Sequence, residues 1–113
     1  MAAARTTVSA LAHKRLARSC TGRLQFWQHP WNGDERVAFV DERVGTAVAW
    51  FKPDARGGWS FDVEDLLAAN DVAFAELWRA ARKRVLSLAG LPPERMSFAG
   101  LRRVAERDGG ALH

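Results

Sequence analysis

The sequence predicts an α+β domain: an N-terminal helix, an antiparallel β-meander of three or four strands, and two or three C-terminal helices packed on the sheet. Three observations support this class. Residues 23–62 are rich in aromatic and β-branched side chains that alternate with polar ones, as in strands. Residues 66–88 repeat apolar side chains every three or four positions, as in an amphipathic helix. A chain of 113 residues suits one domain, over residues 1–113, with its own core.

The first predicted element is a helix over residues 6–20. Thr6 or Thr7 is suited to the N-cap position, and Gly22 marks the end of the pattern. One broad side of this helix is apolar, with Val8, Leu11, Ala12 and Leu16.

Four strands are predicted over residues 23–29, 36–41, 44–52 and 58–62. Pro30 and the Asn32-Gly33 pair interrupt the pattern after the first strand, because proline lacks a ladder donor and Asn-Gly readily adopts positive φ. A tight turn is expected at residues 41–43 and a longer one at residues 53–58. Short connections of this kind favour an antiparallel meander.

Alternation assigns the side chains of these strands to two faces. The first face is expected to hold the large apolar groups of Phe26, Val37, Phe39, Val48, Trp50, Trp59 and Phe61, packed against a helix. The second is expected to hold Ala38, Val40, Ala47, Ala49 and Phe51 on the middle strands. Small residues at its centre suggest close approach by the N-terminal helix or by a second copy of the chain in a homodimer.

Helices are predicted over residues 63–69, 71–89 and 95–107. An unbroken helix over residues 63–89 would be about 40 Å long at 1.5 Å per residue, which exceeds the expected diameter of the domain. We therefore place a break at Asn70-Asp71, where either residue is a good N-cap. Gly90, Pro92 and Pro93 end the long helix before the last one begins.

Composition suggests a cytoplasmic protein without a membrane-spanning or secretory segment. Cys20 is the single cysteine, which fits a reducing compartment. Residues 1–23 carry five basic and no acidic side chains, a composition also found in mitochondrial presequences. The strong preference for arginine over lysine has a second explanation in GC-rich coding DNA.

Charge is segregated along the chain. Residues 1–23 have a net charge of +5, residues 24–76 of −6 and residues 77–113 of +5. Basic helical surface should therefore lie beside an acidic rim of the sheet.

These charges define a candidate binding surface. Arg79, Arg82 and Lys83 share one face of the long helix and are expected to contact phosphates. Arg102 and Arg103 would extend the patch, and Trp31 offers a ring on which bases could stack. The alternative is that these are solvated helix faces balanced by nearby Asp and Glu.

The sequence favours a small non-enzymatic binding or regulatory module that acts on nucleic acid, or on a complex that contains it, through the basic helix face. A first alternative is an inhibitor or accessory protein that docks on a protein partner through the sheet edge and exposed aromatic residues, with Trp27, Trp31 and Phe51 as anchors. A second is a nuclease-like enzyme that uses His29 with Asp34 or Glu35. No cofactor or metal is expected, because no histidine lies at metal-ligand spacing.

Overall fold

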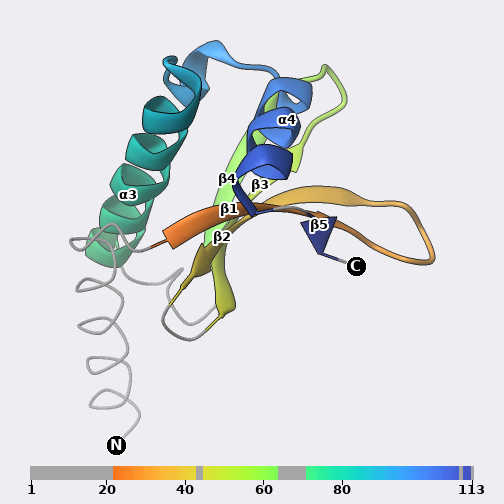
Figure 1. The fold of residues 1–113 in the computed structure, drawn as a ribbon, viewed down its shortest axis with the longest axis horizontal. Helices are drawn as coiled ribbons and strands as arrows, with labels where there is room; N and C mark the ends of the chain where they lie inside the picture. The colour runs from red at the N-terminus through yellow and green to blue at the C-terminus, as the bar shows by residue number, and fades with distance from the viewer. Residues whose placement is uncertain (1–21, 43–44, 64–70, 110, 113) are drawn as a thin grey trace, which may run out of the picture.

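The computed structural model describes residues 22–42, 45–63, 71–109 and 111–112, which form a β-sheet with two α-helices on one face (Figure 1). The elements in chain order are β1 (Gly22–Gln28), β2 (Glu35–Asp41), β3 (Thr46–Pro53), β4 (Trp59–Val63), α3 (Asp71–Ala89), a 3₁₀ turn η1 (Pro93–Arg95), α4 (Phe98–Gly109) and β5 (Ala111–Leu112). The predicted α+β class is confirmed, with a four-stranded antiparallel sheet followed by two helices. The predicted helix over residues 6–20 lies outside the described residues, as do residues 64–69 of the helix predicted over residues 63–69.

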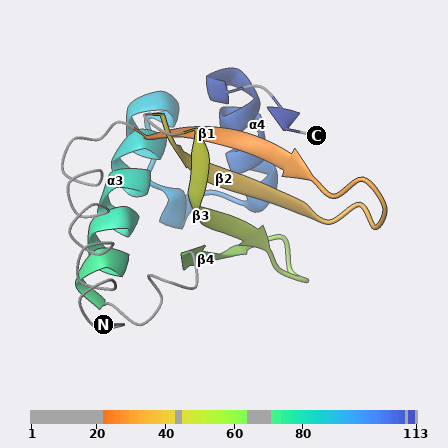
Figure 2. The same ribbon diagram turned by 90° about the horizontal axis from the view of Figure 1, so that it is seen from below.

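The sheet has the strand order β4-β3-β2-β1-β5, and its first four strands lie side by side in Figure 2. Neighbours from β1 to β4 are antiparallel, as in a meander. After α4 the chain returns to the sheet, where β5 pairs in parallel with β1 at Phe26 and Trp27. The sequence did not predict this fifth strand, because two residues are too few to show a period.

β2 ends at Asp41 as predicted, whereas the other strand ends differ by one or two residues from the predicted ones, because turn hydrogen bonds set them. β1 ends at Gln28, since the His29 N–H donates to the Asp34 carbonyl at 2.8 Å and closes the loop. β3 begins at Thr46, after a turn in which Gly45 adopts φ 70° and its N–H donates to the Asp41 carbonyl at 2.7 Å. Val63, where a helix was expected to begin, instead ends β4.

A change of register in β3 corrects the predicted assignment of its side chains to the two faces. Phe39 pairs with Ala49 but Val40 pairs with Ala47, so Val48 is one extra residue on β3. Such a β-bulge inverts the alternation beyond it. Ala49 and Phe51 consequently lie on the helix-covered face with Val48, and Trp50 lies on the other face. Simple alternation predicted the opposite faces for Ala49, Trp50 and Phe51, and the correct face for Val48.

Both α-helices pack on the face that carries Leu24, Phe26, Val37 and Phe39. They contribute Leu77, Ala80, Ala81 and Val85 from α3, and Phe98, Leu101, Val104 and Ala105 from α4. Every one of these side chains is buried, so the helices and the sheet share one core. None of the helices in the described part of the chain is long and apolar enough to cross a membrane.

α3 has the bounds expected from its period, whereas α4 begins three residues later than the helix predicted over residues 95–107. Met96 is extended, with φ −122° and ψ 145°, and this interrupts the helical backbone after η1. The Ser97 hydroxyl then accepts a hydrogen bond from the Gly100 N–H at 3.2 Å, as an N-cap does. At the other end, α4 continues to Gly109, where a Cβ atom would lie 2.3 Å from the Leu24 carbonyl oxygen. Glycine allows this close approach of α4 to β1.

The side chain of Asp108 links this end of α4 to both α3 and β1 through hydrogen bonds. Its carboxylate accepts a hydrogen bond from the Leu24 N–H at 2.7 Å and two from the guanidinium of Arg84 on α3. The hydrogen bond to Asp108 raises the pKa of Arg84 further above the working pH range, in which any arginine is a cation. Three elements therefore meet at one buried carboxylate.

Candidate binding surfaces

Two of the three basic residues predicted as phosphate contacts on α3 have carboxylate partners. Arg79 lies 3.3 Å from Glu76, and Arg82 binds Glu94 at 2.9 Å. Lys83 is exposed and forms no ion pair with the residues that the structure describes. Both arginines lie at the surface, although Glu76 is partly buried, so the pairs contribute little to stability but reduce the charge that the helix presents to a polyanion.

Arg102 and Arg103, expected to extend this patch, have different surroundings. Arg102 binds Glu35 at 2.6 Å and Glu106 at 2.9 Å, and its guanidinium carbon lies 4.2 Å from the ring centre of Phe26. The hydrogen bond to Glu106 and the contact with Glu35 raise the pKa of Arg102. Arg102 thus joins α4 to β1 and β2, whereas Arg103 is exposed and lines a groove beside α3.

Trp31 lies in the β1–β2 loop and is 90% exposed. Figures 1 and 2 both show this loop projecting away from α3. The six residues of the predicted surface therefore do not form one continuous patch.

His29 is not hydrogen-bonded to the carboxylate of Asp34 or Glu35. Its Nδ1 atom accepts hydrogen bonds from the backbone N–H groups of Trp31 and Asn32, at 3.2 and 3.4 Å. Glu35 binds Arg102 instead. The imidazole of His29 therefore holds the backbone of the loop in place. Among the described residues it does not contact a carboxylate as an acid/base pair would require. Among the residues that the structure describes, no group of three or more His, Cys, Asp or Glu side chains could hold a metal ion.

A cluster that the sequence analysis missed lies on the sheet face opposite the helices and consists of Trp27, Arg36 and Trp50. The two indole rings are 6.0 Å apart with an interplanar angle of 68°, and the Arg36 guanidinium carbon is 5.6 and 5.7 Å from their centres. Strands β1 and β3 are separated by β2, about 10 Å apart in total. The rings therefore lean toward each other over β2, and we call these three residues the sheet-face cluster.

The small side chain of Ala38 makes this arrangement possible. Ala38 pairs with Trp50 on β3 and with Gln25 on β1, and it is fully buried. A larger residue on the central strand would hold the two indoles apart. The small side chain at Ala38 had suggested that a helix or a second copy of the chain covers this face. The position of Ala38 between the chain's own two tryptophans is a sufficient reason for a small residue there.

The cluster continues as an aromatic row toward the β1–β2 loop. His29 lies 5.7 Å from Trp27, and Trp31 lies 5.6 Å from His29, both with edge-to-face geometry. Beyond Trp50, Lys52 on β3 forms an ion pair with Asp62 on β4 at 2.6 Å. Trp27, His29, Arg36, Trp50 and Lys52 are all partly exposed, so solvent reaches the whole row.

Charges of both signs lie beside this row. Arg36 and Lys52 line a hollow of about 240 Å³ at the beginning of β2 and the end of β3, together with Asp34, Glu35 and Pro53. Glu35 shares Arg102 with Glu106, and Lys52 pairs with Asp62, so these pairs add no net positive charge to the hollow. Arg36 has no ion pair with any described residue and contributes an unmatched positive charge beside two indoles.

One signal in the sequence could have identified this cluster. Trp27 and Arg36 lie on strands joined by a short loop, and each alternates with buried residues on its own strand. This pattern places both side chains on the same face of the sheet. Trp50 was assigned to the wrong face because the bulge at Val48 is not visible in the alternation. Phe51, considered as an interface anchor, is fully buried.

Comparison with protein-family models, curated proteins and solved structures finds no match to this chain.

Proposed function

We propose that this protein is a small non-enzymatic binding module that binds single-stranded nucleic acid on the sheet face opposite its helices. The observation that carries the proposal is the sheet-face cluster, in which Arg36 lies over Trp27 and Trp50 on an accessible part of the sheet. Unpaired bases stack on indole and guanidinium planes, and the phosphates between them require positive charge. The cluster combines both chemistries.

The dimensions of the row fit a short single strand. Its ring centres are spaced at 6.0, 5.7 and 5.6 Å from Trp50 to Trp31. Sheet faces that recognise RNA stack about two or three bases on aromatic side chains. A duplex, whose bases are already stacked on one another, cannot use the row in this way. The ion pairs of Arg79 and Arg82 are a further reason to prefer the sheet over the α3 face.

Trp50→Leu should weaken binding of a mixed-sequence, fluorescein-labelled 12-mer by about 5- to 150-fold, which corresponds to one lost base stack of about 1 to 3 kcal/mol. The measurement is fluorescence anisotropy with single-stranded DNA and RNA at several salt concentrations. Arg36→Gln should also reduce the slope of log K against log salt by about 0.7, the value for one phosphate contact on a single strand. Thermal unfolding of each variant verifies that it is folded.

The matched control is the reversal of Arg79, Arg82 and Lys83 to glutamate. This variant should bind the 12-mer about as well as the unaltered protein, because α3 lies on the other side of the sheet. If it instead loses affinity for duplex DNA and its salt slope falls by about 2 to 3, while Trp50→Leu binds normally, the α3 face is the nucleic-acid surface. Absence of binding to every single- and double-stranded probe at low salt would contradict the proposal.

Trp31 favours the second candidate function, docking on a protein partner, because a 90% exposed indole is a typical interface anchor. Trp31→Ala would then abolish the partner complex, and Trp50→Leu would not. The remaining alternative is a homodimer through the sheet face. Light scattering of the protein without nucleic acid would then report a dimer that Trp50→Leu dissociates.

A further inference from the structure

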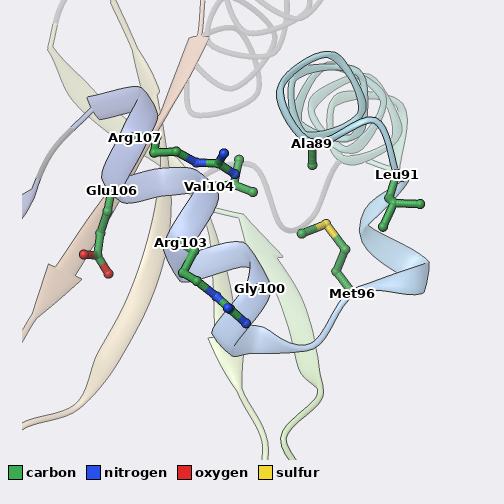
Figure 3. Close-up of a pocket in the computed structure, with 8 residues that line it drawn as sticks. All are labelled: Ala89, Leu91, Met96, Gly100, Arg103, Val104, Glu106 and Arg107. Carbon is green, nitrogen blue, oxygen red and sulfur yellow. The ribbon is translucent and has the colours of Figure 1, made fainter.

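An open groove lies between the C-terminal end of α3 and the exposed side of α4 (Figure 3). Its volume is about 650 Å³, within the usual range of ligand pockets. One wall is apolar and consists of Ala89, Leu91 and Met96. The α4 wall carries Arg103 and Arg107, whose side chains extend along the groove in Figure 3. We call this the α3–α4 groove.

The two arginines of the groove differ from the other arginines of these helices. Arg79, Arg82, Arg84 and Arg102 each have a carboxylate partner. Arg103 and Arg107 have none among the described residues, and Glu106, the acidic residue of the groove, binds Arg102. Like charges four residues apart on a helix repel each other. The α4 wall therefore presents two adjacent, unmatched guanidinium groups.

The apolar wall is also incompletely covered by the rest of the chain. Leu91 is 44% exposed. Leu86 and Leu88, in the last turn of α3 but outside the lining of the groove, are 41% and 37% exposed. Met96 is partly buried and adds a flexible, polarisable surface at the base of the groove. Exposed apolar side chains concentrated within six residues of the chain are typical of a protein-binding surface.

We propose that the α3–α4 groove binds an acidic amphipathic helix of a protein partner. Leucine-like side chains of that helix would pack on Leu91 and Met96, and two carboxylates would bind Arg103 and Arg107. The two arginines are one helical turn apart on α4, and carboxylates three or four residues apart on a partner helix have the same spacing. Guanidinium groups bind carboxylates through paired hydrogen bonds, which supplies orientation as well as charge.

This proposal is independent of the function proposed above. The groove lies on the helical side of the sheet and the sheet-face cluster lies on the opposite side. Occupation of one surface leaves the other accessible. A protein with both surfaces would connect an acidic protein partner to a single-stranded nucleic acid.

The test uses the full chain and three labelled, alanine-based helical peptides of 16 residues. The first has leucine at two positions four residues apart and glutamate on the flank beside them. The second has lysine in place of glutamate, and the third has serine in place of leucine. Fluorescence anisotropy should show that the second and third peptides bind at least about tenfold more weakly than the first, since each lacks one of the two contacts.

The double variant R103E/R107E should weaken binding of the first peptide by at least about tenfold, and Leu91→Ser should also weaken it. Arg79→Glu is the matched control, because Arg79 lies on α3 outside the groove and should leave peptide affinity unchanged. If R103E/R107E is not folded, R103Q/R107Q provides the same comparison without added negative charge.

Three results would overturn the proposal. Equal affinity for the three peptides would show that the groove does not distinguish an acidic apolar helix. Unchanged binding by R103Q/R107Q would show that the arginines do not contact the peptide. Displacement of the peptide by a single-stranded oligonucleotide or by decanoate would assign the groove to phosphates or to small amphipathic anions instead.

Discussion

Replacement of Trp78 by alanine should lower the free energy of unfolding by about 3 to 5 kcal/mol, the usual cost of removing a large aromatic side chain from a core. Trp78 is partly buried at the edge of the core and joins α3 to the sheet through three aromatic contacts. Its ring centre is 5.0 Å from Phe61, 5.8 Å from Trp59 and 6.2 Å from Phe51. The alanine variant would leave a cavity between α3 and strands β3 and β4.

Chemical denaturation of the variant measures this loss. Leu86→Ala is the matched control, since Leu86 belongs to the same helix but is 41% exposed, and we expect it to cost less than about 1 kcal/mol. A loss of less than about 1 kcal/mol for Trp78→Ala would mean that the aromatic contacts of α3 do not support the core.

Asp108→Ala should be the second most damaging substitution, with a loss of about 2 to 4 kcal/mol in the free energy of unfolding. The side chain of Asp108 is only 5% exposed, and it is the hydrogen-bond partner of both the Leu24 N–H and Arg84. Its removal leaves a strand donor without its acceptor and an arginine without its counter-ion. Because Arg84 remains partly exposed, water compensates some of its charge and moderates the loss.

Asp62→Ala provides the comparison for this prediction. Asp62 also forms an ion pair, with Lys52 at 2.6 Å, but its side chain is 51% exposed. An exposed pair contributes about 0 to 1 kcal/mol, so the urea midpoint of this variant should change little. Equal losses for Asp62→Ala and Asp108→Ala would show that the buried junction of α3, α4 and β1 has no special role in stability.

The sequence by itself determined the elements that depend on local patterns. The 3.6-residue period, the N-cap expected at Asn70 or Asp71 and the stop at Gly90 predict α3 with the bounds that the structure has, because helix contacts join residues three or four apart. Alternation and turn residues similarly predict four antiparallel strands. Lys83 and Trp31 were correctly expected to be exposed, since no pattern placed them in the core.

Only the tertiary structure decided which side chains meet. The extra residue at Val48 inverts the faces of β3 and thereby places Trp50 beside Trp27 and Arg36. Arg102 and Arg103 are neighbours in sequence, yet one binds Glu35 on the sheet and the other lines the α3–α4 groove. Local periodicity specifies the face on which a residue lies, but a partner dozens of residues away depends on register, on bulges and on how the helices cross the sheet.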